Sequence, residues 1–421
     1  MPSTAVARAW PQACAAGGRR AVATGASARP VVASALLLPP QELAGARLLY
    51  VTAGAPAHDY PGHAECAERV PAILRALEAG GLTEGARPGE LVQLRGFPPA
   101  ERAAITAVHS PKYVATLEKL SAHSADCGET RVVESSPTYL TGSTSRDAFL
   151  AAGAVIALVD NVVAASRQHE VATDSSASST SSSSSAGGVP AGFAICRPPG
   201  HHSLPSRAMG FCIFGNVAVA ARYAQRQHGL KQVLIIDWDV HHGNGTQDVF
   251  ESDPDVLFIS SHQGGAYPGT GKAGEVGVGD GEGATINIPL PGGAGHDAML
   301  AAWEEVIEPA ARRFKPDIVL VSAGYDAHWA DPLAGLQFRS ATFHHLGALV
   351  KALADELCGG RLVMLLEGGY DLQALGDSVA NTFLGVLGEP ASDPFDPKLL
   401  AEAPVEKVQK VLLEARRIHG L

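Results

Sequence analysis

Cysteine is scarce in this chain, with six residues in 421, at positions 14, 66, 127, 196, 212 and 358. Because no two of them form a Cys-x-x-Cys pair, the spacing indicates reduced thiols and argues against a disulfide framework or a structural zinc cluster. We also find no apolar stretch that approaches the ~20 residues of a membrane-spanning helix. The sequence therefore predicts a protein without disulfides and without a membrane span.

Basic residues are outnumbered: 32 Lys and Arg stand against 43 Asp and Glu, which gives a formal net charge of −11. Proteins that bind nucleic acid usually carry a basic stripe, so we expect no direct nucleic-acid binding. An acidic surface suits a basic peptide or an amine, although net charge alone says little about a partner or about oligomeric state. The 46% apolar content supports a sizeable core for one large domain or two ordinary ones.

Acidic residues are absent from residues 1–41, which contain four arginines (Arg8, Arg19, Arg20 and Arg29) among alanine, serine, threonine and glycine. This composition is typical of a mitochondrial or chloroplast transit peptide. We predict a disordered targeting segment at 1–44, a chloroplast or mitochondrial location, and one folded domain at 45–421. The alternative is an alanine-rich disordered tail on a protein of the cytoplasm or nucleus.

Residues 174–188 form a serine-rich, low-complexity run that cannot bury enough surface to fold. Such a run would be a linker if it separated two domains. Because strand and helix patterns alternate on both sides of it, we interpret it as a loop insertion within one domain, which destabilises a fold very little. Residues 123–144 are also polar, and we expect them to form a long surface loop.

Apolar runs of strand length alternate with segments of helical periodicity along the rest of the chain. Strands are predicted at 48–51, 192–196, 232–237, 256–260, 285–288, 318–322 and 362–366. Helices are predicted at 69–78, 110–120, 147–165, 216–227, 297–314, 342–357, 372–387 and 405–418. This alternation predicts an α/β fold with a single central parallel β-sheet and helices on both faces. Ligands of such sheets bind beyond the carboxyl ends of the strands.

The stretch 237–245, Asp-Trp-Asp-Val-His-His-Gly-Asn-Gly, follows the apolar run 233–236 and so lies at the end of a buried strand. Two carboxylates and two imidazoles in such a place are unfavourable unless they bind or pair with something. Asp239 and His241 are two residues apart, so they can point the same way from an extended segment and hold one divalent ion. A hydrogen-bonded polar strand end is the alternative.

Three more predicted strands end, beside glycines, in ionisable or hydroxyl-bearing residues. These residues are His201, His202, Asp326 and Tyr370. Their convergence on one sheet edge predicts an active site. Together with Asp239 and His241, Asp326 would give a metal three ligands and leave a position open for water and substrate.

The same residues suggest a reaction. A histidine close to the attacking water, His201 or His202, can act as general base and then as acid for a leaving amine. The Tyr370 hydroxyl can donate to a developing oxyanion, and Gly368 lets the backbone approach closely. The residues thus predict metal-assisted hydrolysis of an amide, with ordinary packing as the alternative for Tyr370.

Taken together, these motifs resemble the zinc-dependent histone deacetylase family, with its arginase/deacetylase fold, over about residues 48–390. The segments that carry the resemblance are 197–202 (Arg-Pro-Pro-Gly-His-His), 210–212 (Gly-Phe-Cys), 237–245, 267–271 (Tyr-Pro-Gly-Thr-Gly), 322–328 (Ser-Ala-Gly-Tyr-Asp-Ala-His) and 367–371 (Glu-Gly-Gly-Tyr-Asp). Asn244 and the Gly-Tyr-Asp ending are similar to the class II branch. The whole chain is most similar to the organelle-directed class II deacetylases of plants and algae.

The resemblance implies one zinc ion per chain, bound by Asp239, His241 and Asp326. It further implies that His202 is the general base and acid. His201 would support it electrostatically, with Asp237 as the hydrogen-bond partner of His201. Tyr370 is the oxyanion donor, and its presence leads us to expect a competent enzyme.

Two further groups of residues are matched through the resemblance. The residues expected to hold structural potassium are Asp237 and Ser260 at one site, and Phe250 and Val256 at a more peripheral one. The residues expected to form a tunnel for an acyl-lysine stem are Phe211, Tyr267, Gly368 and, at the mouth, Leu333.

The chain also departs from the family pattern. Asn244 stands where class I members have a carboxylate, so the tuning of His202 must differ. Tyr267 replaces a common phenylalanine and adds a hydroxyl to the tunnel rim. Glu129 and Glu134 are the candidates for the loop that anchors the substrate backbone.

Two other functions are considered. A ureohydrolase-like enzyme of the same fold would need two manganese ions bridged by several carboxylates, and Asn244 occupies the place of a further acid. A non-catalytic acyl-lysine-binding scaffold would not need the full set of ligands, base and oxyanion donor. The favoured substrates are acetyl-lysine side chains of proteins, with small acetylated amines such as N-acetylserotonin also open.

We expect residues 1–60, fused to a fluorescent protein, to carry it into a chloroplast or a mitochondrion, because their arginine-rich, acid-free composition is that of a transit peptide. Fluorescence microscopy against organelle markers measures this. The matched control is the same fusion with the four arginines replaced by glutamine. A cytoplasmic or nuclear signal from the unmodified fusion would contradict the prediction.

Overall fold

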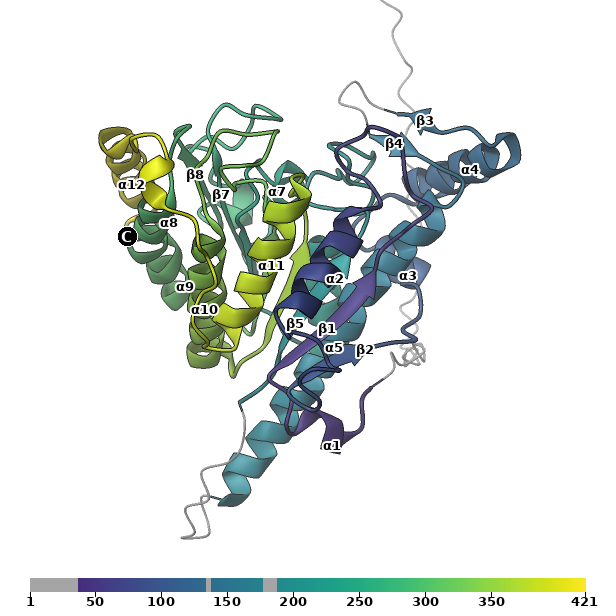
Figure 1. The fold of residues 1–421 in the computed structure, drawn as a ribbon, viewed down its shortest axis with the longest axis horizontal. Coiled ribbons are helices and arrows are strands. Elements are labelled where there is room, and N and C mark those ends of the chain that lie inside the picture. Colours follow the sequence, from purple (N-terminus) through teal and green to yellow (C-terminus); the bar gives the residue numbers. More distant parts are fainter. Residues whose placement is uncertain (1–36, 134–137, 177–187) are drawn as a thin grey trace, which may run out of the picture. The chain divides into compact units, whose positions relative to one another are not determined.

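In the computed structural model, which describes residues 37–133, 138–176 and 188–421, eight strands form one parallel sheet (Figure 1). The strand order is β2-β1-β5-β10-β9-β6-β7-β8. The strands are β1 (Leu48–Ala53), β2 (Leu91–Leu94), β5 (Ala191–Cys196), β6 (Val233–Asp237), β7 (Val256–Gln263), β8 (Thr285–Leu290), β9 (Ile318–Ala323) and β10 (Leu362–Leu366). Every predicted strand is present, and the predicted α/β architecture is confirmed.

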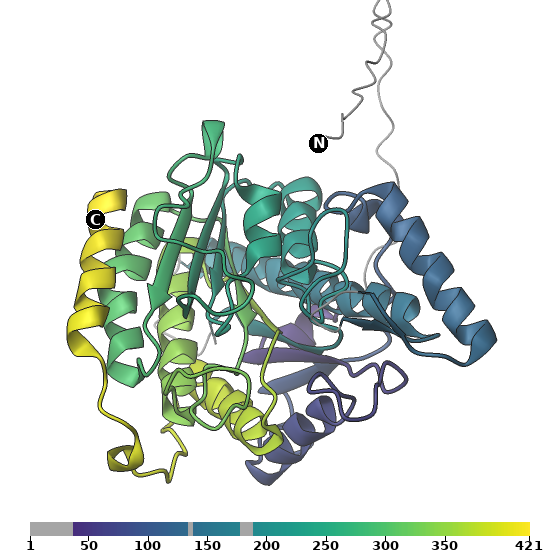
Figure 2. The same cartoon turned by 90° about the horizontal axis from the view of Figure 1, so that it is seen from above.

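Helices pack on both faces of the sheet (Figures 1 and 2). One face is covered by α2 (Arg69–Ala79), α8 (His296–Ala302), the π-helical turn η3 (Trp303–Ile307), α9 (Glu308–Phe314), α10 (Ser340–Cys358), α11 (Leu372–Val386) and α12 (Val405–His419). The other face is covered by α1 (Pro40–Leu43), α5 (Thr144–Ser176), α6 (Asn216–Tyr223) and the π-helical turn η1 (Ala224–His228). The remaining helical segments are α3 (Arg102–Ile105), α4 (Pro111–Cys127), α7 (Asn244–Phe250) and the short 3₁₀ turns η2 (Gly279–Gly281) and η4 (Pro397–Leu399).

The sheet separates two apolar cores. In β1, Leu48 and Tyr50 belong to the core under α2 and α11, whereas Leu49 and Val51 belong to the core under α5. Successive side chains of a strand point to opposite faces, so a strand buried on both sides reads as a continuous apolar run. The four-residue edge strand β2 is too short to give this signal, and the sequence analysis missed it.

The strands that carry the polar motifs are neighbours. β5, β10, β9 and β6 lie side by side in that order, and all run parallel. Their carboxyl ends therefore reach the same edge of the sheet. The register places the last residue of β6, Asp237, opposite Ser322 of β9 and Ser260 of β7. This topology brings residues far apart in sequence to one place.

The described residues between 123 and 144 do not form the predicted surface loop. α4 continues to Cys127, and β3 (Arg131–Val132) pairs with β4 (Tyr139–Leu140) in an antiparallel hairpin. Tyr139 is only 1% exposed, because its hydroxyl bonds the backbone carbonyls of His58 and Glu65. The polar composition of the segment concealed these tertiary contacts. Glu134 lies outside the described residues.

Helix α5 corrects two further predictions. It contains a window long and apolar enough to cross a membrane, with mean hydropathy 2.0, so the statement that the chain lacks such a stretch was wrong. However, 83% of that window is buried inside the fold, where α5 packs against β1 and β5. The helix also continues to Ser176, so the predicted serine-rich loop cannot begin at 174; residues 177–187 lie outside the described part.

The predicted start of the folded domain at residue 45 is too late. The short helix α1 buries Leu43, which is 3% exposed, in the core under α5. The backbone N–H of Leu38 donates to Asn161 Oδ1 at 2.8 Å. Residues 38–44 therefore belong to the fold, and the remainder of the predicted targeting segment, 1–36, lies outside the described residues.

Helices α10 and α11 approach closely at glycines. A Cβ added to Gly385 would lie 2.0 Å from the carbonyl oxygen of His344. We expect Gly385→Ala to lower the free energy of unfolding by about 3 kcal/mol, because backbone must move to make room. Gly85 is the matched control, because a Cβ added there would have no heavy atom within 4 Å. Gly85→Ala should change the free energy of unfolding by less than about 0.5 kcal/mol. Urea denaturation measures both, and equal stabilities would contradict this account.

Candidate active site

Three potential metal ligands converge beyond the ends of β6 and β9. Nδ1 of His241 lies 3.2 Å from Asp239 Oδ1 and 3.2 Å from Asp326 Oδ2, and the three ligand atoms all lie within 4.8 Å of one another. Asp239 and Asp326 are buried, and the His241 side chain is 12% exposed. Two carboxylates and one imidazole around a common point form a donor set suited to a divalent transition metal.

Backbone groups orient the two carboxylates. The N–H of Gly368 donates to Asp239 Oδ2 at 2.8 Å, and the N–H of Val240 donates to Asp326 Oδ1 at 2.8 Å. Each carboxylate therefore has one oxygen fixed by the backbone while the other faces His241. The residues thus fit a bound metal, with the orientation of each ligand set by the main chain.

The absence of side chains at two glycines is a condition for this arrangement. A Cβ on Gly368 would lie 2.0 Å from Asp326 Oδ2, and a Cβ on Gly324 would lie 2.1 Å from Asp239 Oδ2. Any other residue at these positions would displace the carboxylates. Gly368, which the sequence analysis assigned to the substrate tunnel, therefore also bounds the ligand set.

The electrostatics of the three ligands follow from their burial and proximity. Burial lowers the pKa of His241, but the hydrogen bonds to Asp239 and Asp326 outweigh it and raise the pKa to about 10. Burial raises the pKa of Asp326, and the nearby Asp239 carboxylate raises it further. Without a metal, a proton on His241 therefore offsets part of the carboxylate charge.

Two adjacent histidines stand beside the ligands, with ring centroids 4.0 Å apart. His201 Nδ1 lies 3.0 Å from Asp237 Oδ2, and His202 Nδ1 lies 2.7 Å from Asn244 Oδ1. Burial lowers the pKa of His201, but the Asp239 and Asp237 carboxylates outweigh it and raise the pKa well above its ordinary value. Burial, together with His201 and His241, holds the pKa of His202 well below its ordinary value.

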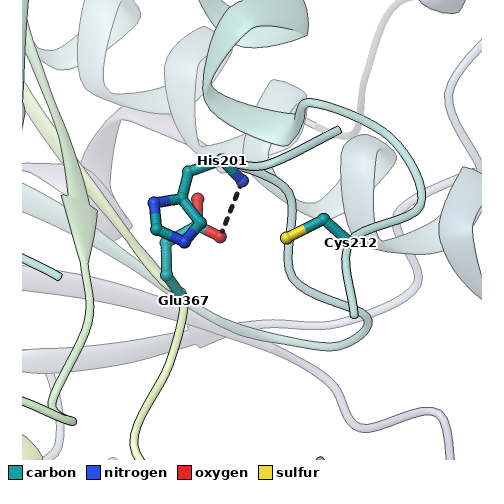
Figure 3. Close-up of side chains that lie close together, drawn as sticks. All are labelled: His201, Cys212 and Glu367. Atoms are coloured by element: carbon teal, nitrogen blue, oxygen red, sulfur yellow. Dashed lines mark hydrogen bonds between the residues drawn. The ribbon is translucent and has the colours of Figure 1, made fainter. Parts of the chain in front are cut away.

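The peptide turn that carries both histidines is held by Glu367. Its Oε2 accepts hydrogen bonds from the N–H groups of Gly200 at 2.7 Å and His201 at 3.1 Å, and its Oε1 accepts one from the Ser322 hydroxyl at 3.0 Å. Figure 3 shows the Glu367 carboxylate against the His201 backbone, with the sulfur of Cys212 nearby.

His201, Cys212 and Glu367 also have donor atoms within 4.8 Å of one another. The geometry argues for a structural role, because both oxygens of Glu367 and the Nδ1 of His201 are already hydrogen-bonded. Burial, with Glu367 close by, also raises the pKa of the Cys212 thiol well above its ordinary value. A protonated thiol is a poor metal ligand.

Tyr370 follows Glu367 in a tightly tethered turn. The guanidinium of Arg69 donates to the carbonyls of Glu367 at 2.6 Å and Gly369 at 2.7 Å, and its carbon lies 5.0 Å from the centre of the Tyr370 ring. Burial and the Asp326 carboxylate raise the pKa of the Tyr370 phenol well above its ordinary value. The phenol therefore stays protonated and able to donate.

A buried ion-pair cluster, which the sequence analysis missed, supports this turn. Glu65 is fully buried and binds Arg69 at 3.2 Å and Arg197 Nη2 at 2.7 Å. Burial raises the pKa of Glu65, but the two guanidinium groups outweigh it and lower the pKa to about 2. Arg197 could have indicated this cluster, because it directly follows the apolar strand β5 and a buried charge needs a partner.

Two of the expected tunnel residues, Tyr267 and Phe211, contact His202 and Tyr370. The Tyr267 ring is perpendicular to the His202 ring, with centroids 5.0 Å apart. The Phe211 ring lies between His63, at 4.6 Å, and Tyr370, at 5.7 Å. Phe211 has φ +67°, an unusual conformation for a residue with a side chain, and its N–H donates to Thr138 Oγ1. Leu333 is 41% exposed.

The other assigned residues are placed as follows. Asp237 and Ser260 lie opposite each other in adjacent strands and are both fully buried. Phe250 ends α7, and Val256 begins β7. Glu129, proposed as a substrate anchor, is exposed just after α4. His242 bonds Thr270 Oγ1 and Gln247 Oε1, and so takes no part in the ligand set.

Comparisons with known proteins agree with this geometry. The family profile described as "Histone deacetylase domain" matches residues 63–386. "Histone deacetylase 10, chloroplastic" of Oryza sativa subsp. japonica is 51% identical over 388 residues, which cover 92% of this chain and 84% of the relative. "Histone deacetylase 14, chloroplastic" of Arabidopsis thaliana is 50% identical over 383 residues, covering 90% and 86%.

A solved structure leads to the same assignment. The crystal structure of the HD domain of HDA15 superposes with a TM-score of 0.73 at 31% sequence identity, covering 88% of this chain and 95% of that one. The eight-stranded parallel sheet with helices on both faces is therefore the arginase/deacetylase fold expected from the sequence. On the profile match, the relatives and the shared fold, this chain belongs to the histone deacetylase family.

Proposed function

We propose that the protein is a zinc-dependent deacetylase that hydrolyses the acetyl amide of acetyl-lysine side chains. The observation that carries this proposal is the convergence of Asp239, His241 and Asp326 beside His202 and Tyr370. When bound by these three ligands, zinc would polarise the amide carbonyl and lower the pKa of the attacking water. Side chains of this chain supply the general base and the oxyanion donor.

His202 supplies the general base. Asn244 Oδ1 can only accept a hydrogen bond, so His202 Nδ1 carries the proton and Nε2 keeps a lone pair. Because burial and the neighbouring imidazoles lower its pKa, His202 is neutral near pH 7. Nε2 can take a proton from the attacking water and later donate it to the leaving amine.

His201, unlike the neutral His202, is protonated. The carboxylates of Asp237 and Asp239 favour its protonated form, and its Nδ1 donates to Asp237. A charged His201 next to His202 lowers the basicity of His202 in the free enzyme, so that His202 does not hold a proton before the reaction. The pair thus carries one positive charge, which resides on His201.

Tyr370 supplies the oxyanion donor. Its hydroxyl makes no hydrogen bond to any residue that the structure describes, and its raised pKa keeps the proton on the phenol. A donor already in place when negative charge develops on the amide oxygen stabilises the transition state more than the ground state. The tethered turn keeps this donor beside the ligand set.

The tunnel residues favour a long, thin acyl-amine. The aromatic rings of Phe211 and Tyr267 lie close to Tyr370 and His202, and they would pack against an aliphatic stem. This arrangement supports acetyl-lysine in proteins as the substrate. Small acetylated amines such as N-acetylserotonin are a second candidate, because a short substrate can use the same rings.

A single zinc ion is favoured over the two-metal, ureohydrolase-like alternative. A second ion would need further free carboxylates beside the first, but both oxygens of Glu367 and both oxygens of Asp237 already take part in hydrogen bonds. The non-catalytic scaffold alternative leaves the paired histidines and the tethered Tyr370 without a purpose. Structural potassium, at Asp237 and Ser260 and at Phe250 and Val256, completes the proposal on the basis of the family resemblance.

The proposed location is the chloroplast. Both chloroplastic relatives are similar to this chain over nine-tenths or more of its length. The acid-free, arginine-containing residues 1–41 have the composition of a transit peptide. The mitochondrion is the second candidate.

We expect His202→Ala to reduce acetate release from an acetyl-lysine peptide by about 10²- to 10⁴-fold while leaving zinc bound, because it removes the base but no ligand. Asp326→Asn should lose activity and also weaken zinc binding. Acetate release and metal content, measured together, test both. Full activity in either variant would contradict the assignment.

The exposed His123 on α4 provides a matched control for these variants. His123→Ala removes an imidazole far from the ligand set and should retain both activity and zinc. Two zinc ions per chain in the unmodified protein would instead favour the ureohydrolase-like alternative.

We expect zinc binding to the metal-free protein to release a proton and to strengthen as the pH rises. His241 has a pKa raised to about 10, so it is protonated near pH 7 and must lose that proton to coordinate zinc. Affinity should rise by about tenfold per pH unit for each proton released, between pH 7 and 9. Chelator competition at several pH values measures it. A pH-independent affinity would contradict the proposed ligand role of His241.

A further inference from the structure

A single buried carboxylate connects the loop after β9 to the turn that carries Tyr370. Asp331 Oδ2 accepts hydrogen bonds from the backbone N–H of Tyr370 at 2.7 Å and of Asp371 at 3.4 Å. Its other oxygen, Oδ1, accepts the N–H of Leu333 at 2.9 Å. Asp331 is 6% exposed, so these contacts form away from bulk water.

The loop that contains Asp331 is itself fixed at its base. The N–H of Trp329 donates to the carbonyl of Phe338 at 2.9 Å, and the N–H of Phe338 donates to the carbonyl of Ala327 at 3.0 Å. The base of the loop therefore continues directly from the metal ligand Asp326. As a result, Asp331 has a defined position relative to the ligand set.

The Tyr370 turn depends on Asp331 for one of its restraints. Arg69 holds the carbonyls of Glu367 and Gly369, and the N–H of Tyr325 holds the carbonyl of Gly368 at 3.0 Å. The backbone N–H of Tyr370 itself is bonded by Asp331. Arg69 at the Gly369 carbonyl and Asp331 at the Tyr370 N–H therefore hold the two sides of the peptide group from which the phenol extends.

A carboxylate in this place is energetically unfavourable on its own. Burial and the like charge of Asp326 raise the pKa of Asp331 to about 7, and its hydrogen-bond partners are all backbone N–H groups. An apolar residue would avoid the cost of burying charge, but it could not accept three N–H bonds on two oxygens. The chemistry therefore points to a requirement for hydrogen-bond acceptors that join the two segments.

We propose that Asp331 is a positioning residue that holds the Tyr370 phenol at the reacting carbonyl and links it to the mouth residue Leu333. The proposal rests on the proposed function, in which Tyr370 is the oxyanion donor. Asp331 touches no reacting atom and acts through the peptide group of Tyr370. A shift of about 1 Å in a catalytic donor is enough to slow a reaction by about a hundredfold.

The test is a double-mutant cycle on the zinc-loaded full chain, with an acetyl-lysine peptide as substrate. We expect Asp331→Ala to lower kcat at least tenfold with KM changed less than about twofold, because an interaction of the transition state is lost. Asp331→Asn keeps one acceptor oxygen, so its kcat should lie between that of Asp331→Ala and that of the unmodified enzyme. In a Tyr370→Phe background, neither substitution should lower kcat further, since both act through the same hydroxyl.

Asp371→Asn is the matched control. Asp371 directly follows Tyr370, and its carboxylate caps α11 by accepting the N–H of Ala374 at 2.8 Å. Asparagine caps a helix as well as aspartate does, so this variant should keep its stability and kcat. Zinc content should be unchanged in all variants, because none of these residues is a ligand.

The outcomes separate the inference from the proposed function. If Tyr370→Phe lowers kcat but the Asp331 variants leave it unchanged, or lower it equally in both backgrounds, the positioning role is overturned and the deacetylase mechanism stands. If Tyr370→Phe retains full activity, the oxyanion role fails and the positioning role with it. The proposal is supported if both Asp331 variants lower kcat and this drop vanishes in the Tyr370→Phe background. A cooperative thermal melting transition of Asp331→Asn shows that this variant is folded.

Discussion

The structure is organised around the burial of two like charges, Asp239 and Asp326, on either side of His241. Carboxylates in a low-dielectric interior repel each other and are strongly unfavourable unless cations or hydrogen-bond donors compensate them. A proton on His241 offsets part of this charge, and a divalent ion in its place would offset more. The surrounding elements therefore supply N–H groups and exclude side chains, so that the two acids can face one point.

Compensation comes largely from the backbone, which cannot be displaced without changing the fold. Gly368 donates to Asp239 and leaves no room for a side chain beside Asp326. Its neighbours are held in turn by Arg69, whose own charge is balanced by the buried Glu65. The ion-pair cluster thus acts at a distance from the ligands: it fixes the turn whose backbone N–H orients a ligand carboxylate.

The sequence was sufficient to predict the sheet and the convergence of Asp239, His241 and Asp326, because both depend on local pattern. The buried strands read as apolar runs, and Asp239, His241 and Asp326 follow two of them directly. Prediction from sequence failed where contacts between distant residues decide the structure. Tyr139 lies in a polar segment, yet it is buried because its hydroxyl donates a hydrogen bond to Glu65, 74 residues earlier in the sequence. The same limit hid Asp331, whose donors are backbone groups that no residue type reveals.

His201 and His202 show how the groups beside an imidazole decide its protonation state. His201 and His202 are adjacent in sequence and equally buried at 3% exposure, and their rings are tilted by 39° with centroids 4.0 Å apart. Only His201 has a carboxylate at Nδ1, whereas His202 has the neutral amide of Asn244. Burial lowers both pKa values, but the Asp239 and Asp237 carboxylates outweigh it at His201. At His202, burial and the neighbouring imidazoles prevail, so the two pKa values move in opposite directions. Asn244 therefore orients the His202 ring and adds no charge to it, and the charged His201 further favours the unprotonated state that the proposed general base needs.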